Sequence, residues 1–195
     1  MKAYYHARAH EYDDWWLGRG RYTGQARPGF DKELEELGGL IRQLSPVRTL
    51  DVGCGTGFLT QHLRGEVVGL DSSETMLELA RERVPSVTFV QDDALALPFG
   101  DGTFDRVFST FFYCHLEEAE RLLFLSEARR VAPELVVIGS VPGEGDPLER
   151  WEERQLGDGS RWRVFKRVFV PEQLAEELDG RVAHAGEWFV MVVSP

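Results

Sequence analysis

Residues 50–57 read Leu50-Asp51-Val52-Gly53-Cys54-Gly55-Thr56-Gly57. They close the apolar segment 47–52 with glycines at every second position, and a helical spacing of apolar residues resumes over 58–63. This order predicts a strand, a glycine loop and a helix. Because glycines permit a tight turn and leave the backbone open to close approach, we expect a polar ligand to dock on the loop.

Strands and helices are predicted to alternate on both sides of this loop. Helices are expected over 33–44, after Ser73 and over 117–131, and strands over 66–71, 87–90, 104–112 and 135–141. These strands are nearly continuous in apolar residues, which is typical of a parallel sheet covered on both faces.

The sequence changes character after Val141, where prolines and glycines interrupt it. We expect a charged helix over 148–156, a strand over 161–170, a helix from Pro171 to Asp179-Gly180, and two strands around Gly186-Glu187. The first two elements would form an insertion over one end of the sheet. The last two strands would add an antiparallel edge.

The predicted fold is therefore α/β: a Rossmann-like three-layer sandwich with a mostly parallel, twisted sheet of about seven strands and an antiparallel edge strand. We expect one domain over residues 1–195. Its parts would be N-terminal helices forming a lid (1–45), a ligand-binding core (46–141), an insertion or cap (142–170), and a C-terminal helix with edge strands (171–195).

The chain has 195 residues and a formal net charge of −11. Lysine and arginine supply most of the affinity for phosphate backbones, so we expect no nucleic-acid partner. The basic residues within 161–167 are more typical of the solvated face of a strand. No apolar run approaches the ~20 residues of a membrane span, and no signal peptide is recognisable, so we expect a cytoplasmic protein without a membrane partner.

Cys54 and Cys114 lie in segments that read as buried strand ends rather than in a spaced framework. We therefore expect two thiols, without a disulfide or a metal site.

Polar residues follow the predicted strands, at the edge where ligands of open α/β sheets bind. Asp71 closes the second strand, where its carboxylate would accept both hydroxyl protons of a ribose; the competing interpretation is a helix N-cap, which Ser72 or Ser73 could also provide. Asp92-Asp93-Ala94 follows the third strand and could meet an adenine edge, or form a solvated turn. The alternate glycines after Asp51 do not fit the G-x-G-x-x-G pattern of dinucleotide sites.

Three stretches within about 49–141 carry a family resemblance. They are residues 50–57, Val68-Gly69-Leu70-Asp71-Ser72-Ser73 with Met76-Leu77, and Asp93-Ala94-Leu95-Ala96-Leu97-Pro98-Phe99 with Phe104-Asp105. In these the chain resembles the class I S-adenosylmethionine-dependent methyltransferases, particularly the small-molecule branch similar to ubiquinone and menaquinone biosynthesis enzymes. It departs from the family at Ala132-Pro133-Glu134, where a Pro-Gly-Gly turn usually stands.

The resemblance implies a cofactor, S-adenosylmethionine, that leaves as S-adenosylhomocysteine, and no metal. It implies that the loop around Gly53 and Gly55 cradles the methionine part, that Asp71 holds the ribose, and that Asp93 and Ala94 meet the adenine. The full set of cofactor-site residues implied is Asp51, Gly53, Cys54, Gly55, Gly57, Asp71, Ser72, Met76, Asp93, Ala94, Ser109 and Thr110, the last two beside the sulfonium, with Tyr5, Arg8 and Tyr12 from the N-terminal segment near the cofactor's carboxylate.

The aromatic N-terminal segment 4–16 has two interpretations. Aromatics with polar tips suit a lid over a ligand, and an amphipathic helix would pack Tyr5, Tyr12 and Trp16 on the core. Both can hold together.

His115 lies shortly after the fourth strand, where it would act either as a general base for the acceptor or as a structural histidine. Tyr113 and Trp162 are candidates for an aromatic acceptor pocket, and Arg161 or Arg163 for a contact with an acceptor carboxylate.

We expect methyl transfer to the oxygen, carbon or nitrogen of a small molecule, by a monomer or homodimer. The alternative is a non-catalytic S-adenosylmethionine-binding regulatory or scaffold protein, against which the intact first motif speaks. A run of Asn or Asp followed by Pro-Pro and an aromatic residue is absent after the fourth strand, where Ser109-Thr110-Phe111-Phe112 stands. This disfavours methylation of amino groups on bases or glutamine.

Overall fold

The computed structural model describes residues 2–195. Its helices are α1 (Lys2–Arg8), α2 (Asp14–Leu17), α3 (Phe30–Gln43), α4 (Glu74–Arg83), α5 (Glu118–Val131) and α6 (Pro171–Glu177), with short 3-10 turns η1 (Ala9–Glu11), η2 (Gly20–Tyr22), η3 (Thr60–His62) and η4 (Tyr113–His115). Its strands are β1 (Thr49–Val52), β2 (Val67–Asp71), β3 (Thr88–Gln91), β4 (Arg106–Thr110), β5 (Glu134–Ser140), β6 (Glu149–Gln155), β7 (Arg161–Arg167), β8 (Arg181–Ala185) and β9 (Phe189–Ser194). None of the helices within 2–195 is both long and apolar enough to cross a membrane.

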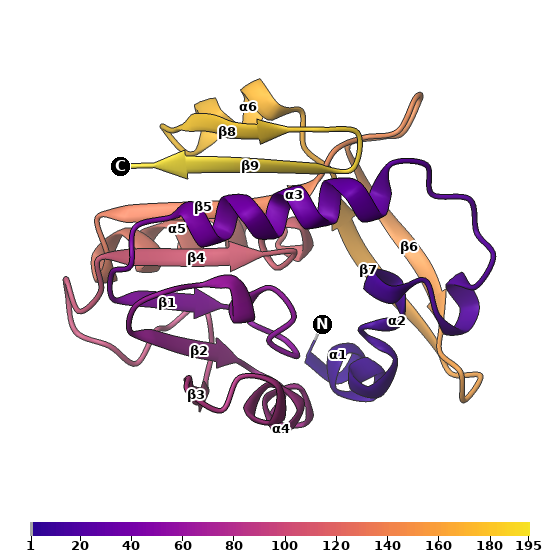
Figure 1. Cartoon of the computed structure of the whole chain (residues 1–195), viewed down its shortest axis with the longest axis horizontal. Helices are drawn as coiled ribbons and strands as arrows, with labels where there is room; N and C mark the ends of the chain where they lie inside the picture. Colours follow the sequence, from indigo (N-terminus) through magenta and orange to yellow (C-terminus); the bar gives the residue numbers. More distant parts are fainter. Residues whose placement is uncertain (1) are drawn as a thin grey trace.

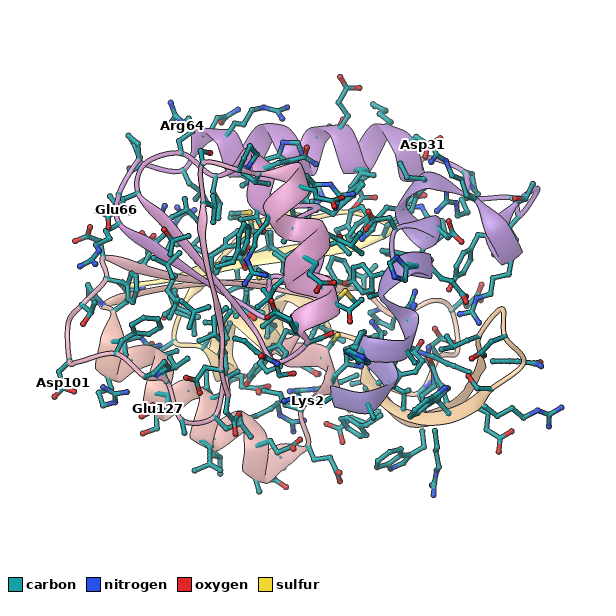
Figure 2. The ribbon with its side chains drawn as sticks, turned by 90° about the horizontal axis from the view of Figure 1, so that it is seen from below. Lys2, Asp31, Arg64, Glu66, Asp101 and Glu127 are labelled. Atoms are coloured by element: carbon teal, nitrogen blue, oxygen red, sulfur yellow. The ribbon has the colours of Figure 1, made fainter. Side chains whose placement is uncertain are left out.

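Seven strands form one sheet in the order β3-β2-β1-β4-β5-β9-β8. Strands β1 to β5 pair in parallel, whereas β9 runs antiparallel to β5 and β8 antiparallel to β9. Helix α3 crosses one face of the sheet and α5 lies behind the other (Figure 1), and the view from below places the sheet between them (Figure 2). The predicted Rossmann-like sandwich with an antiparallel edge is confirmed.

The sheet changes direction at β1. Thr49 of β1 pairs with Val67 of β2 on one side and with Arg106 of β4 on the other. The chain builds outward from β1 to β3 and then returns across β1 to place β4. Ligands of open α/β sheets bind at this point of reversal, outside the carboxyl ends of the strands.

A buried carboxylate fixes α3 to the antiparallel edge. Glu33 accepts hydrogen bonds from the backbone N–H groups of Glu187 at 3.0 Å and Phe189 at 2.8 Å, and its Oε1 lies 3.1 Å from His184 Nε2. Below it, Leu37 and Ile41 of α3 are fully buried against the sheet. The tight turn between β8 and β9 is therefore held by one side chain of a distant helix.

The N-terminal segment and the β6–β7 hairpin lie beyond the carboxyl ends of β1 and β4 (Figure 1). Trp16 of α2 is buried and stacks on Phe58, with ring centroids 5.0 Å apart. Tyr4 of α1 packs with Leu156 and Val164 of the hairpin region. Both elements therefore cover the end of the sheet where ligands bind.

Two predicted helices are wrong. Only the 3-10 turn η3 forms within 58–63, because the chain must turn at Gly65 to enter β2; a Cβ there would lie 2.5 Å from the Val47 carbonyl oxygen. Residues 148–156 form strand β6 rather than a helix. They pair with β7, and alternate residues of the strand are half-buried, which allows polar side chains to face inward.

Candidate active site

The glycine loop follows β1 with backbone angles that favour glycine. Gly53 has φ +72° and Gly55 φ +54°. A Cβ on Gly53 would lie 2.5 Å from Phe112 Cβ, which is closer than packed atoms approach. The loop therefore passes directly beside the segment that follows β4, and a side chain would fill that space.

Asp71, at the end of β2, is tied to the same loop. Its Oδ2 accepts a hydrogen bond from Gly55 N at 3.0 Å, and its Oδ1 accepts one from Ser73 N at 2.9 Å. Burial raises the pKa of this carboxyl, although these backbone hydrogen bonds oppose the rise. Ser73 is the N-cap of α4, since its Oγ accepts a hydrogen bond from Met76 N at 3.4 Å, so Asp71 is not needed in that role.

A cavity of about 610 Å³ opens along the carboxyl ends of β1, β2, β3 and β4. We call it the first cavity. The predicted site residues that line it are Tyr5, Tyr12, Gly53, Gly55, Asp71, Ser72, Met76, Asp93, Ala94 and His115. Its walls also include Asp92, which belongs to the predicted adenine-edge run 92–94. The other wall residues were not expected at the cofactor: Lys2, Leu70, Gln91, Leu95, Phe111, Phe112, Leu116 and Glu120. Its size is within the ~300–1,000 Å³ typical of small-molecule sites.

The loop after β3 is stabilised by hydrogen bonds within residues 92–95. Leu95 N donates to Asp93 Oδ1 at 2.9 Å, and Asp93 N donates to Asp92 Oδ1 at 2.8 Å. The turn predicted as the alternative for these residues is therefore present, and it holds Asp93 and Ala94 at the wall of the first cavity.

Other predicted cofactor residues lie behind the wall. Asp51 is buried, and its Oδ2 accepts a hydrogen bond from Thr60 Oγ1 at 2.6 Å. Its Oδ1 and the buried Ser109 Oγ have no hydrogen-bond partner within 2–195. Burial raises the pKa of Asp51 to about 7. Cys54, Gly57 and Thr110 are likewise outside the lining of the first cavity.

His115 lies in η4, at the wall between the first cavity and a second one. Its Nδ1 lies 2.7 Å from the Phe165 carbonyl oxygen, which requires a proton on Nδ1 and leaves Nε2 as the acceptor in the neutral ring. Burial, together with the charges of Lys166 and Arg154, holds the pKa of His115 well below 6.5. The ring is therefore neutral near pH 7.

The second cavity, of about 320 Å³, lies between the N-terminal segment and the β6–β7 hairpin. It shares Tyr5, Tyr12, Phe111 and His115 with the first cavity. The rest of its wall is Arg8, Trp15, Trp16, Arg21, Tyr22, Ser140, Glu152, Glu153, Arg154 and Lys166. Phe111 adopts φ +54°, a conformation that costs energy for a bulky residue and that is held by aromatic neighbours such as Trp16, 5.0 Å away.

The N-terminal segment packs on the core and also lines both cavities, and its role as a lid stays a prediction. Trp16 packs in the core, whereas Tyr5 and Tyr12 line the two cavities, with Tyr5 5.5 Å from the His115 ring. Arg8 is buried and lines the second cavity only.

The proposed acceptor residues do not come together. Tyr113 is buried and donates a hydrogen bond to Glu177, Trp162 packs on Tyr4, and Arg161 is exposed. Neither cavity includes them.

Sequence reasoning missed Arg154 and Lys166. Arg154 lies in the segment expected to be a helix. Lys166 could have been placed, because alternation along the predicted strand puts it on the face opposite Arg161 and Arg163.

Comparison with known proteins finds methyltransferases. Residues 49–134 match the family model of a methyltransferase domain. A malonyl-[acyl-carrier protein] O-methyltransferase of Erwinia pyrifoliae is 37% identical over 141 residues, covering 68% of this chain and 52% of that protein. A demethylmenaquinone methyltransferase of Thermotoga maritima is 37% identical over 97 residues, covering 47% of this chain and 42% of that protein. The chain thus spans about half the length of these relatives.

A solved structure described as a DhpI–SAH complex superimposes with a TM-score of 0.77 at 25% identity, covering 98% of this chain and 92% of that one. Together with the matched domain, this similarity confirms the resemblance predicted from the three motifs. The matched residues 49–134 contain the glycine loop, Asp71, Asp93 and the wall segment 111–116.

Proposed function

We propose that this chain, whose fold and matched domain are those of the class I S-adenosylmethionine-dependent methyltransferases, transfers a methyl group to a small molecule. One observation carries the proposal: a single cavity collects the glycine loop after β1, Asp71 after β2 and Asp93 after β3. These are the three groups that the motifs assigned independently to one cofactor.

The residues present fit S-adenosylmethionine. Gly53 and Gly55 leave the loop open to the methionine part, and Asp71 retains lone pairs beyond its two backbone hydrogen bonds for the ribose hydroxyls. Asp93 and the Ala94 backbone would meet the adenine. The unpartnered Asp51 Oδ1 marks a polar region directly behind the loop. When bound, the cofactor supplies an electrophilic methyl group on a positively charged sulfur.

The acceptor is proposed to enter through the second cavity. Its shared wall with the first cavity, made by Tyr5, Tyr12, Phe111 and His115, is where a methyl donor and an acceptor could meet. Methyl transfer needs alignment and exclusion of water more than chemical groups. The aromatic rings of this wall provide both, and His115 Nε2 can accept a proton or orient a hydroxyl there.

The relatives named above are methyltransferases, and neither supports the alternative of a non-catalytic binding protein. We propose that the acceptor is a small molecule rather than a nucleic acid, given the net charge of −11.

The test is calorimetric titration of S-adenosylmethionine and S-adenosylhomocysteine into the wild-type chain, Asp71→Ala and Asp31→Ala. Asp31 is a matched control, because its side chain is 92% exposed on α3, at the periphery of the molecule (Figure 2). We expect binding that Asp71→Ala weakens by about ten-fold or more and Asp31→Ala leaves unchanged. Absence of binding to the wild-type chain would contradict the proposal. Binding of S-adenosylmethionine without methyl transfer to any small acceptor would favour the non-catalytic alternative.

A further inference from the structure

The second cavity is positively charged in a strongly acidic protein. Four cationic side chains line it (Arg8, Arg21, Arg154 and Lys166) against two carboxylates (Glu152 and Glu153), a formal balance of 4 − 2 = +2. The whole chain has a net charge of −11. Cationic side chains are therefore concentrated here against the trend of the molecule.

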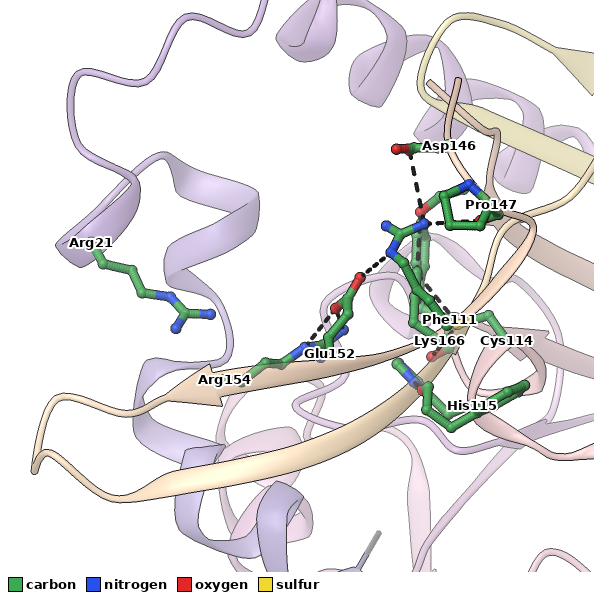
Figure 3. Close-up of polar contacts among 12 residues, drawn as sticks. Arg21, Phe111, Cys114, His115, Asp146, Pro147, Glu152, Arg154 and Lys166 are labelled. Atoms are coloured by element: carbon green, nitrogen blue, oxygen red, sulfur yellow. Dashed lines mark hydrogen bonds and ion pairs between the residues drawn. The ribbon is translucent and has the colours of Figure 1, made fainter. Parts of the chain in front are cut away.

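Some of these cations already have partners. Arg154 pairs with Glu152 at 2.6 Å, as Figure 3 shows. Glu152 also pairs with Arg150 at 2.9 Å. Arg21 donates to the Gln155 carbonyl oxygen at 2.6 Å and to the Tyr22 hydroxyl at 2.7 Å, both of which are neutral. Glu152 thus compensates Arg154, although it is shared with Arg150, whereas Arg8, Arg21 and Lys166 form no ion pair with a carboxylate of residues 2–195.

Lys166 is one of these. Its Nζ lies 3.4 Å from Ser140 Oγ, 3.6 Å from Cys114 Sγ and 5.7 Å from the centre of the Phe111 ring. Figure 3 places it beside Phe111, Cys114 and His115, and no ion pair joins it to a carboxylate of residues 2–195. The groups that contact its Nζ are neutral, Arg150 lies opposite it in the hairpin, and the Glu152 carboxylate acts on it only from beyond ion-pair distance. A half-buried ammonium without an ion pair costs free energy, which a bound anion would offset.

Arg8 is another. It is 8% exposed and stacks over the Tyr12 and Tyr4 rings, at 5.1 and 5.8 Å from their centres, again without an ion pair in the described chain. The carboxylate of the cofactor could compensate Arg8, as the family resemblance implies. It could not also compensate Lys166, because one carboxylate carries one charge.

We propose that the second cavity binds an anionic oxygen group of the methyl acceptor, a carboxylate or a phosphate-type group, at Lys166 with Arg154 beside it. Only the identification of the anion as the methyl acceptor rests on the proposed function. The anion site itself follows from the side chains that line the cavity. The shared wall at Phe111 and His115 puts that anion next to the first cavity.

His115 provides a spectroscopic readout for the site. The titratable and charged groups around the ring are Lys166 from β7, Arg154 from β6, and Arg8 and Tyr5 from α1. Burial and the three cations lower the pKa of His115. A bound anion would offset part of that positive charge and therefore raise the pKa toward its usual value.

The experiment uses the full chain saturated with S-adenosylhomocysteine, with malonate and inorganic phosphate as probes and uncharged malonamide as the control. Binding is measured by calorimetry, and the His115 Cε1 resonance is followed through a pH titration by NMR. We expect at least one of the two anions to bind and to raise the pKa of His115, whereas malonamide does neither. The tighter of the two anions identifies the carboxylate or the phosphate-type source.

Three substitutions at two positions of β7 distinguish a specific anion site from an effect of overall charge. Lys166→Met should weaken anion binding by roughly ten-fold or more, and Lys166→Arg should restore most of it. Arg163→Met removes the same charge from an exposed position three residues away and should leave binding unchanged. A cooperative unfolding transition in Lys166→Met excludes loss of fold as the cause.

The proposal is overturned if neither anion binds, if Lys166→Met binds the anions as the wild-type chain does, or if malonamide binds equally well. If S-adenosylhomocysteine itself does not bind, the proposed function fails. The same anion titrations on the chain alone then still test the anion site.

Discussion

Asp51 is a buried carboxyl group behind the glycine loop whose Oδ1 has no hydrogen-bond partner in the described chain. Burial raises its pKa from 3.8 to about 7, despite the hydrogen bond from Thr60. A carboxyl group with a raised pKa stabilises the fold fully below its unfolded pKa, and that contribution is lost as the pH rises through the folded pKa. Asp51 should therefore penalise the folded state near neutral pH.

The isosteric variant Asp51→Asn cannot ionise and should escape this penalty. Its free energy of unfolding relative to the wild-type chain should rise by a few kcal/mol, about 2–4, between about pH 4 and about pH 8. Urea unfolding at the two pH values measures the change, with the exposed Asp101→Asn as the control. An unchanged difference between the two proteins at both pH values would refute a raised pKa at Asp51.

Alanine substitutions at Gly53 and Gly102 distinguish the cost of backbone strain from the cost of a steric clash. Both have positive φ angles, +72° and +61°, but a Cβ at Gly53 would lie 2.5 Å from Phe112, whereas one at Gly102 would have no atom of residues 2–195 within 4 Å. Gly102→Ala should cost about 1 kcal/mol from strain alone. Gly53→Ala should cost at least ~1 kcal/mol more and weaken S-adenosylhomocysteine binding. Equal losses of stability in urea unfolding would show that the loop can move away from Phe112.

Among the elements, the N-terminal segment is held to the core most firmly at its C-terminal part. Asp13 forms an ion pair with Arg83 and accepts a hydrogen bond from Thr56 Oγ1 at 2.7 Å, and Trp16 is buried in the core. Helix α1 is only seven residues long and carries Tyr5 at the wall between the cavities. Short helices of this kind depend on tertiary contacts for their stability.

We therefore expect the amides of α1 to exchange hydrogen rapidly in the free chain and to slow when S-adenosylhomocysteine binds. Those of α2 and the central strand β4 should change little, which makes them the internal control. Hydrogen exchange followed by mass spectrometry measures both. If the exchange of α1 is indifferent to the ligand, the segment is a fixed wall rather than a lid.

The sequence predicted correctly the elements that are buried in the central sheet. It failed where a partner distant in the sequence determines the secondary structure. The apolar strands and the Ser73 cap are local signals, and the carboxyl ends of parallel strands necessarily meet, which located Asp71 and Asp93. Residues 148–156 have no apolar alternation, and only pairing with β7 makes them a strand. The second cavity was missed for the same reason, because it joins α1, η4 and the hairpin from distant parts of the chain.

At the scale of the whole molecule, the charge around His115 links ligand binding to stability. Its pKa is lowered by burial and then by Lys166 and Arg154. The contribution of a histidine with a depressed pKa is present above its unfolded pKa, near 6.5, and is lost as the pH falls toward the folded pKa. An anion in the second cavity raises the folded pKa and so reduces that loss.

Malonate should therefore raise the thermal midpoint of the chain more at about pH 5 than at about pH 8. Differential scanning fluorimetry measures the increments, and His115→Asn should make them more nearly equal. If malonate raised the thermal midpoint more at about pH 8 than at about pH 5, an anion beside the His115 ring would be contradicted.

In the proposed arrangement the methyl donor lies in the first cavity with its methyl group at the wall shared with the second. NMR of the chain with S-adenosylmethionine labelled with carbon-13 in its methyl group tests this placement. We expect nuclear Overhauser contacts from that methyl group to the ring protons of Phe111 or His115. Contacts only to the opposite end of the cavity, at Gln91 or Leu95, or no bound methyl resonance at all, would contradict it.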